Sequence, residues 1–410
     1  MVKIRFTIEA YIRTIRFMWI WQSVLWPQFS FDSNALQAAL VAARRAQGRL
    51  LGAAEQLQLL DTSELQLAIW TREALATAQI EGEVLQLNSV RASAARRLGL
   101  VPDPTVHKDE RTEATLDVIQ AATGSWQQPL THGALYSWQA ALFPTGYSGI
   151  TRIDVGSYRT HTEPMQIVTQ RLGENDVIHY QAPESKDVPR QMKALLAWLN
   201  DDRINGKLAV TDGLIRAAIA HLWFEAIHPF EDGNGRIGRA LAERCLAQDV
   251  QSELRLFSLS QQFMLDRAGY YAQLQRASNF SSKFDRAQSA EMDITAWIRW
   301  FLGCVEKACL ESLVQMAQAN AKNKFNYRLQ SSHPDLSKSQ RKVLFKLFEA
   351  RQTNATLDDP GGFSGGMSTE KYVAISGVSR ATAYRELTDL VAQQLLTISG
   401  QGRATRYALA

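Results

Sequence analysis

The sequence predicts a mainly α-helical protein of several domains, with one small β-hairpin and a C-terminal winged helix-turn-helix. Apolar residues recur at helical spacing from residue 31 to 98, without proline, and the helical pattern continues from about 110 to 325. Glycine, aspartate, threonine and β-branched residues interrupt it between Ser148 and Tyr180, where we expect a hairpin with a turn at 173–176. Residues 368–410 read as helix, turn, helix and two alternating strands.

Composition narrows the class of protein. A chain of 410 residues is too long for one ordinary core, so two or three domains are expected. The 45 basic and 41 acidic residues nearly balance, which excludes a dominant attraction to nucleic acid or to a membrane surface. No apolar run approaches the roughly 18 residues of a membrane span. Three cysteines are too few for a disulfide framework or a structural zinc site, so we expect a cytoplasmic protein without a membrane partner.

Changes in residue composition and hydrophobic pattern along the chain predict four segments. Residues 1–17 form an apolar and basic extension, and the functional start is expected at Met18; an interfacial amphipathic helix is the alternative interpretation of the extension. An N-terminal helical domain is predicted at 18–110 and a second helical domain at 111–325. The small C-terminal domain is predicted at 333–410, beginning at His333-Pro334.

The most informative segment runs from His228 to Arg239 and reads HPFEDGNGRIGR. A helical run from Thr211 to Ile227 precedes it, and it must end before Pro229 because the residue before proline is pushed out of the α region. His228 is therefore expected at a helix end, where an imidazole can face a reactant. A second helix is expected from Arg236 to Gln248.

The residues between these two helices carry complementary chemistry. Gly233, Asn234 and Gly235 lead into the second helix, so free backbone N–H groups and the positive helix end form an anion nest. Arg236 and Arg239 are three residues apart and share a helix face beside this nest, and Asp232 supplies a carboxylate oxygen for Mg²⁺. A base, a metal ligand, an anion cradle and two cations are what phosphoryl or nucleotidyl transfer requires.

This segment resembles the motif of the Fic family, HPF-x-(D/E)-GNGR-x-x-R, at every specified position. The resemblance implies a protein adenylyltransferase that uses ATP and Mg²⁺ to attach AMP to a Ser, Thr or Tyr hydroxyl of a protein. It assigns the general-base role to His228 and the Mg²⁺ to Asp232. It also implies that the α- and β-phosphates are bound by Gly233, Asn234, Gly235 and Arg236, and the γ-phosphate by Arg239. Gly235 and Arg239 favour AMP transfer over the phosphate transfer of one relative, whereas phosphocholine transfer stays open.

The resemblance extends to other parts of the chain. Residues of about 112 to 300 look like the family's helical domain, and the tryptophan-rich block from Trp19 looks like the opening of a domain that accompanies many bacterial members. In the family, a hairpin flap pairs with the target peptide by strand addition; the matching residues here are Met165, Gln166, Ile167 and Val168. Tyr271, next to Tyr270, resembles an aromatic pair that approaches the nucleotide, although a simply packed helix is the equal alternative.

An inhibitory sequence is also implied. Thr77 and Glu81 lie four apart on one helix face, and Gly82 ends the helical run. Beside the motif, these three residues resemble the family's inhibitory sequence (S/T)-x-x-x-E-(G/N), which implies that Glu81 pairs with Arg239.

Partners and rival functions remain open at this point. The predicted recognition helix, 379–385, and Arg403 and Arg406 of the wing fit either DNA or a protein, because the basic excess of the domain is slight. The acceptor is a target protein with an accessible hydroxyl, or the chain itself, and a homodimer is compatible with the sequence. The rival hypotheses are a DNA-binding regulator that only senses nucleotide and an enzyme that removes AMP from modified protein.

Overall fold

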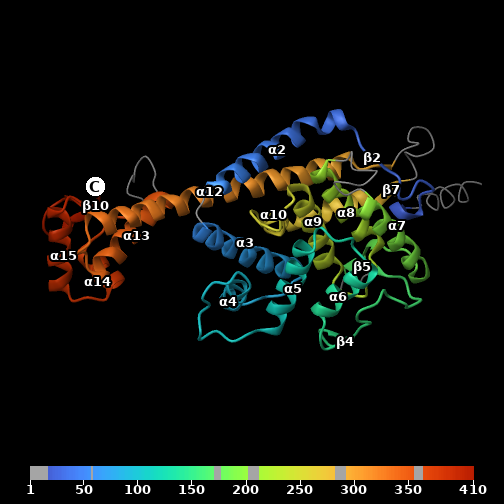
Figure 1. Ribbon diagram of the computed structural model, residues 1–410, viewed down its shortest axis with the longest axis horizontal. Helices are drawn as coiled ribbons and strands as arrows, with labels where there is room; N and C mark the ends of the chain where they lie inside the picture. Colours follow the sequence, from blue (N-terminus) through green and yellow to red (C-terminus); the bar gives the residue numbers. More distant parts are fainter. Residues whose placement is uncertain (1–16, 57–58, 170–176, 202–211, 282–291, 355–362) are drawn as a thin grey trace, which may run out of the picture. The chain divides into compact units, whose positions relative to one another are not determined.

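The computed structural model describes residues 17–56, 59–169, 177–201, 212–281, 292–354 and 363–410, and this part of the chain is mainly helical, as predicted (Figure 1). The chain divides into two compact units, Met1–Leu313 and Val314–Ala410, and the division falls inside the long helix α12 (Thr295–Ser332). The predicted extension lies outside the described residues, except for Phe17 at the start of strand β1. In the described residues, no helix is both long and apolar enough to span a bilayer.

The first unit contains most of the helices. They are α2 (Ser33–Glu55), α3 (Leu59–Ile80), α4 (Leu87–Arg97), α5 (Glu110–Gly124), α6 (His132–Leu142), α7 (Val188–Asp201), α8 (Gly213–Ile227), α9 (Asn234–Val250), α10 (Leu259–Leu265), α11 (Arg267–Ser278) and the first part of α12. Short 3-10 helices lie at Ile20–Gln22 and Ser185–Asp187.

Helix α8 lies at the centre of this unit. Almost every residue of α8 is buried, and its sequence is apolar on all sides, as a fully enclosed helix requires. The Trp297 indole donates to the Ala218 carbonyl at 2.8 Å and fixes α12 against α8. The rings of Phe263, Tyr270 and Trp297 stack on His221 with centroid distances of 5.8–5.9 Å. The neighbouring helix α9 makes the most extensive packing with α8, so this pair holds the loop between them rigidly.

Helix ends in this unit are fixed by side chains. Asp32 caps α2 by accepting from the Asn34 and Ala35 N–H groups, at 2.9 and 3.0 Å. Arg44 of α2 binds Asp212, the N-cap of α8, at 2.7 Å, and Asp249, near the end of α9, at 2.5 Å. The helix α2 is thereby tied to the end of the α8–α9 pair that lies opposite the connecting loop.

The strands of the first unit are short and form two-stranded sheets. They are β1 (Phe17–Trp19) with β7 (Asn279–Ser281), β2 (Phe29–Ser30) with β8 (Met292–Asp293), β3 (Tyr147–Ser148) with β4 (Thr151–Arg152), and β5 (Gln166–Thr169) with β6 (Val177–Gln181). The β5–β6 pair is the predicted hairpin, whose predicted turn at 173–176 lies outside the described residues. The sequence prediction missed the second hairpin, β3–β4. The segment between the two hairpins is hydrogen-bonded to the loop after α8: the Arg159 N–H donates to the Pro229 carbonyl at 3.0 Å.

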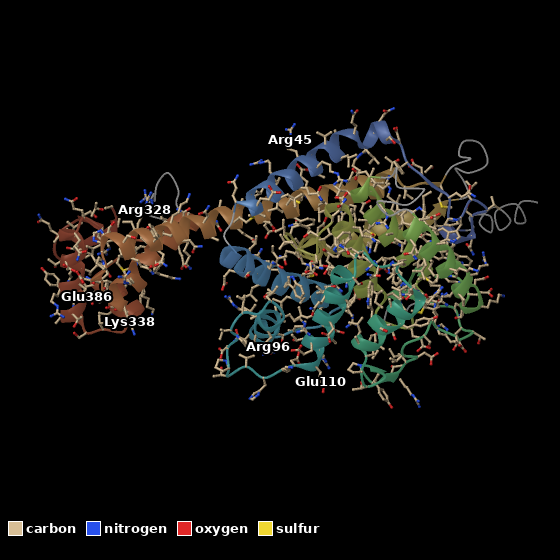
Figure 2. The ribbon with its side chains drawn as sticks, in the orientation of Figure 1. Arg45, Arg96, Glu110, Arg328, Lys338 and Glu386 are labelled. Atoms are coloured by element: carbon tan, nitrogen blue, oxygen red, sulfur yellow. The ribbon has the colours of Figure 1, made fainter. Side chains whose placement is uncertain are left out.

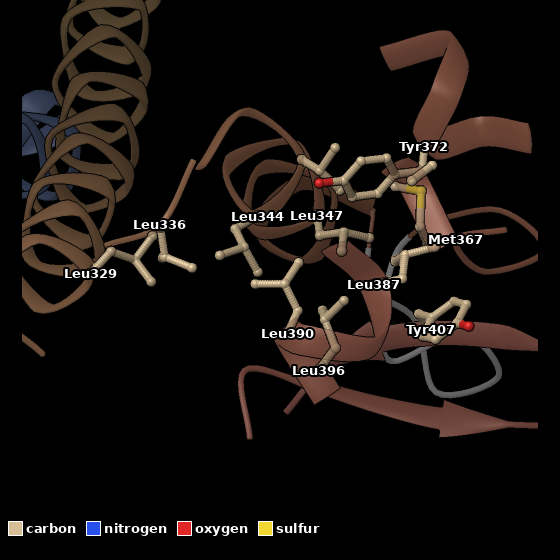
Figure 3. Packing of buried hydrophobic residues seen from close by; sticks show 12 residues of the cluster. Leu329, Leu336, Leu344, Leu347, Met367, Tyr372, Leu387, Leu390, Leu396 and Tyr407 are labelled. Atoms are coloured by element: carbon tan, nitrogen blue, oxygen red, sulfur yellow. The ribbon is translucent and has the colours of Figure 1, made fainter. Parts of the chain in front are cut away.

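The C-terminal unit has the predicted order of helices and strands. Helices α13 (Lys338–Asn354), α14 (Thr369–Ser376) and α15 (Arg380–Ala392) precede the antiparallel strands β9 (Leu396–Ser399) and β10 (Arg406–Leu409). Gly377, with φ of 77°, makes the turn between α14 and α15. Buried side chains from all these elements form its core (Figure 3). Glu386 (labelled in Figure 2) accepts hydrogen bonds from Ser337, Ser339 and Tyr372 at 2.6–2.7 Å and links α15 to α13 and α14.

Candidate active site

His228 occupies the left-handed C-cap of α8, with φ of 50° and ψ of 60°. This conformation is unusual for a residue other than glycine, although it is common where a helix ends. Pro229 disfavours the right-handed α region at His228 and so ends α8 there. Arg159, buried to 2% exposure, stabilises the turn: its Nε donates to the His228 carbonyl at 2.8 Å. The backbone at His228 is therefore held in place, and 14% of the side chain is exposed.

The environment keeps the His228 imidazole neutral. Burial, together with the positive charge of Arg159, lowers the pKa of His228 to about 4. At pH 7 the ring is uncharged, which is the form that can accept a proton from a hydroxyl.

The loop after His228 is closed by Asn234. Its side-chain oxygen accepts from the Phe230 N–H at 2.9 Å, and its amide donates to the Phe230 carbonyl at 2.8 Å. Phe230 itself is fully buried. Asn234 was predicted as a phosphate ligand, and with its side chain used in this way, only its backbone N–H is left for that role.

The anion nest begins at Gly233, which is the N-cap of α9. Gly233 has φ of 87°, and a Cβ there would lie 3.0 Å from the Phe143 ring, so conformation and space both require glycine. The helix α9 begins at Asn234, two residues earlier than the prediction of Arg236. Its first-turn N–H groups, including those of Asn234 and Gly235, have no acceptor within the helix and lie at its positive end.

Asp232 lies directly before this nest. Its carboxylate accepts from the Ser148 hydroxyl of β3 and from the Gly233 N–H, the latter at 2.5 Å. The described residues contain no group of three His, Cys, Asp or Glu side chains placed to hold a metal ion. A single carboxylate beside an anion site nevertheless suits Mg²⁺, which usually takes one or two carboxylates and completes its shell with water and substrate phosphates.

Arg239 is a deeply buried cation of the site, at 2% exposure. Its guanidinium donates to the Thr77 hydroxyl at 2.8 Å, to the Thr77 carbonyl at 3.0 Å and to the Glu81 carboxylate at 2.8 Å. Gly82, with φ of 82°, turns the chain after α3 and leaves Glu81 directed at α9. Gly235 also contributes, because a Cβ there would lie 2.3 Å from the Glu81 carboxylate oxygen. The structure thus brings together the three residues of the predicted inhibitory sequence and the last arginine of the motif.

A second ion pair beside the first was missed by the sequence analysis. Glu83 accepts from Arg236 at 2.9 and 3.2 Å, and the Arg236 guanidinium lies 5.1 Å from the centroid of the Phe143 ring. The sequence feature that could have indicated this ion pair is Glu83 itself, a second acidic residue two positions after Glu81 on the same turn. A pocket of about 380 Å³ opens beside Arg236, lined also by Phe143, Ser148 and Glu110 (labelled in Figure 2). Its size falls in the range of small-molecule sites.

The remaining predicted residues lie around the end of α3 and on the flap. The Tyr271 hydroxyl donates to the Ile80 carbonyl at 3.2 Å and 42% of the residue is exposed, whereas Tyr270 is buried and bonds His221. On the flap, Gln166 begins β5 and Ile167 is 43% exposed, while Met165 packs against a buried cluster. Val168 pairs with Ile178 through its backbone, after a bulge.

Family models and curated relatives match parts of this chain. Residues 129–246 match the Fic/DOC family, and residues 19–100 match a domain of unknown function, DUF4172. A probable protein adenylyltransferase of Aquifex aeolicus is 33% identical over 70 residues, which is 17% of this chain and 20% of the relative. Protein adenylyltransferase fic-1 of Caenorhabditis elegans is 44% identical over 54 residues, 13% of this chain and 10% of the relative. The matched segments therefore span a fifth or less of these relatives.

Solved structures share the fold. A Fic family protein from Desulfovibrio desulfuricans is 20% identical, covers 93% of this chain and 97% of its own, and superposes with a TM-score of 0.50. A Fic domain containing signaling protein from Bacteroides thetaiotaomicron is 18% identical, covers 68% of this chain and 96% of its own, and gives a TM-score of 0.51. At this identity the likeness concerns the fold alone.

The role of Asn234 leads to a prediction about stability. Asn234→Ala leaves the buried Phe230 N–H and carbonyl unpaired, which costs about 1–3 kcal/mol for each group, so we expect the free energy of unfolding to fall by about 2–6 kcal/mol. Chemical denaturation followed by tryptophan fluorescence measures this change. Asn234→Asp keeps the acceptor for the Phe230 N–H but places an oxygen against the Phe230 carbonyl, so it should also be less stable than the wild type. Equal stability of all three proteins would show that the loop does not depend on this side chain.

Proposed function

We propose that this chain, which carries a Fic domain in residues 129–246, is a protein adenylyltransferase that transfers AMP from ATP to a hydroxyl of a target protein. The observation that carries the proposal is the neutral, rigidly held His228 placed one short loop before the anion nest at the start of α9. The two relatives described above are named a probable protein adenylyltransferase and a protein adenylyltransferase, which supports this choice among nucleotide reactions.

The proposed reaction uses the residues of this loop in turn. The N–H groups at the start of α9, with Arg236 and Arg239, bind the phosphates of ATP. His228 takes the proton of the target hydroxyl as its oxygen attacks the α-phosphorus. The bond from the α-phosphorus to the bridging oxygen breaks, and pyrophosphate leaves. The rigid turn at His228 lowers the cost of orienting the base for this step.

Asp232 would hold Mg²⁺ in this proposal. When bound, the metal neutralises charge on the phosphates and on the leaving pyrophosphate. Asp232 is kept in place by Ser148 and by the Gly233 N–H, so its carboxylate is presented at the edge of the nest.

The target protein is proposed to bind along the flap. Strand β5 pairs with β6 in the described residues, which leaves its other edge available for strand addition. Ile167 and Ile178, 43% and 44% exposed, lie at this hairpin and offer apolar contacts to a peptide.

In the resting chain, Glu81 is proposed to be inhibitory. Its carboxylate occupies Arg239 at the place proposed for the γ-phosphate, so ATP is excluded or bound with its α-phosphate misdirected. Glu83 holds Arg236 in the same way, which extends the block to the second cation of the site.

The first test concerns the general base. In a chain that also carries Glu81→Gly, so that the cation site is open, His228→Ala removes the proton acceptor but keeps the nest, so ATP binding should persist while transfer falls by about 10²–10⁴. Incubation with ATP labelled on the α-phosphate, using the chain itself and native cell extract as acceptors, measures transfer, and calorimetry measures binding. Undiminished labelling by the variant would refute the role of His228. Absence of labelling by every variant, together with salt-dependent DNA binding, would favour the nucleotide-sensing regulator, whereas release of AMP from labelled protein would favour the reverse reaction.

The second test concerns Glu81. Glu81→Gly frees Arg239 for phosphate, so labelling should rise, by about tenfold for each 1.4 kcal/mol of pairing that is lost, until the site is fully open. Initial labelling rates and melting temperatures of the variant and the wild type give the comparison. Glu81→Gln, which keeps the shape and removes the charge, is the matched control and should also be activated. If the Glu81→Gly protein is folded and labels no faster than wild type, residues 77–82 are an ordinary helix end without an inhibitory role. Activity surviving in Glu81→Gly with His228→Ala would place the gain at another site.

A further inference from the structure

Glu225 lies one helical turn before His228 and has no part in the mechanism so far. Its carboxylate is 11% exposed, and its Oε2 lies 3.9 Å from the His228 Nδ1. Among the described residues, neither the His228 Nδ1 nor the Glu225 Oε1 has a hydrogen-bond partner of normal geometry, and the Glu225 backbone carbonyl is a second acceptor near the imidazole. Buried polar atoms are rarely left unpaired, because each costs about 1–3 kcal/mol. The unpaired Oε1 faces Gly238 of α9, and Oε2 is the oxygen nearest to the unpaired Nδ1, so a small rotation of either side chain would bring Oε2 within hydrogen-bond distance of the imidazole.

The surroundings of Glu225 are built to admit a carboxylate. A Cβ on Gly238 of α9 would lie 2.4 Å from the Glu225 Oε1 and 3.3 Å from the His221 Nδ1, so glycine at this position leaves the space that the carboxylate occupies. Gly238 is one of the unspecified positions of the motif described above. Its lack of a side chain is thus explained by Glu225 and not by a phosphate.

We infer that Glu225 is a positioning residue for His228, whose carboxylate accepts the Nδ1–H of the imidazole and so leaves the lone pair on Nε2. The inference rests on the proposed adenylyl transfer. With the proton on Nδ1, Nε2 takes the proton from the target hydroxyl, and the positive imidazolium that results lies beside a negative carboxylate. In this active form Glu225 is ionised, and its carboxylate does not take the proton of the target hydroxyl.

The protonation state of Glu225 then governs the base. Charged and titratable groups face it from several elements: Glu81 after α3, Arg239 of α9, Tyr270 of α11, Tyr180 of β6, and His221 and His228 of α8. Burial raises the pKa of Glu225 to about 8, against the opposing charge of Arg239 and with a further increase from Glu81. Below this pH a protonated Glu225 would donate to Nδ1 and place the ring proton on Nε2, where it blocks base catalysis. Transfer should therefore increase as pH rises and Glu225 loses its proton.

The experiment uses the full chain carrying Glu81→Gly, in which labelling is expected to be fast enough to measure. Rates of α-phosphate labelling are recorded between pH 5 and about 9, with ATP varied, for this protein and for its Glu225→Gln and Glu225→Leu derivatives. The parent should show a rise with a midpoint at or below about 8, because loss of Glu81 lowers the pKa of Glu225. Gln keeps an acceptor for Nδ1–H and should lose this rise and about tenfold in kcat, while Leu should lose about a hundredfold, with KM for ATP little changed in both.

A matched control and a second measurement separate the possible failures. Glu243→Gln removes another buried carboxylate of raised pKa and should leave the pH profile unchanged. Nitrogen-15 NMR of labelled imidazoles, with the His228 signal identified by its loss in His228→Gln, should show the proton on Nδ1 at pH 9, and a mixture of tautomers in Glu225→Leu. Suppose that the parent labels. If Glu225→Leu then has the same rate and pH profile as the parent, or if the tautomer of His228 does not depend on residue 225, the inference about Glu225 is wrong while the proposed function stands. If the parent does not label, or labels without His228, the proposed function fails, and the tautomer still reports on Glu225.

Discussion

The site depends on one constraint: a guanidinium that is 2% exposed needs an anion beside it. Removing a charge from water costs several kcal/mol unless a partner of opposite charge and hydrogen bonds replace the lost hydration. Arg239 finds those bonds on Thr77 of α3 and on Glu81, which directly follows α3. The docking of α3 on α9 therefore rests on the same cation that is proposed to bind phosphate. Arg239 thus has two candidate anionic partners, the Glu81 carboxylate and a phosphate, and the folded chain itself supplies the first.

The parts of the site that follow from local sequence were predictable. Pro229 fixes the end of α8, because proline restricts the residue before it, and the structure places His228 at that end. The loop after it needs Gly233, since a positive φ and the nearby Phe143 ring both exclude a side chain. Spacing alone placed Thr77 and Glu81 on one helix face. The predicted start of α9 was less accurate. Asn234 closes the loop by hydrogen bonds to the backbone of Phe230, four residues earlier, and sequence periodicity does not reveal such bonds.

The residues that were missed act across long separations in the chain. Arg159 reaches the His228 carbonyl from 69 residues away, and Ser148 reaches Asp232 from 84 residues away. Glu83 binds Arg236 across 153 residues. Such contacts depend on how helices pack and not on local propensity. Glu225 was missed for a different reason: within an apolar helix, a single glutamate three residues before a histidine has no spacing that separates it from an ordinary helix side chain.

Glu81 and Glu83 lie on a single short turn at the end of α3 and together hold both cations of the site. Since they are joined by one residue, they leave or return as a unit. A carboxylate pair attached to the same chain is an intramolecular competitor, whose effective concentration is set by the tether and not by dilution. Under the proposed function, the apparent affinity for ATP is then the intrinsic affinity scaled by the fraction of chains in which this turn is displaced. Any partner that binds the end of α3 would thus tune nucleotide occupancy without touching the nucleotide.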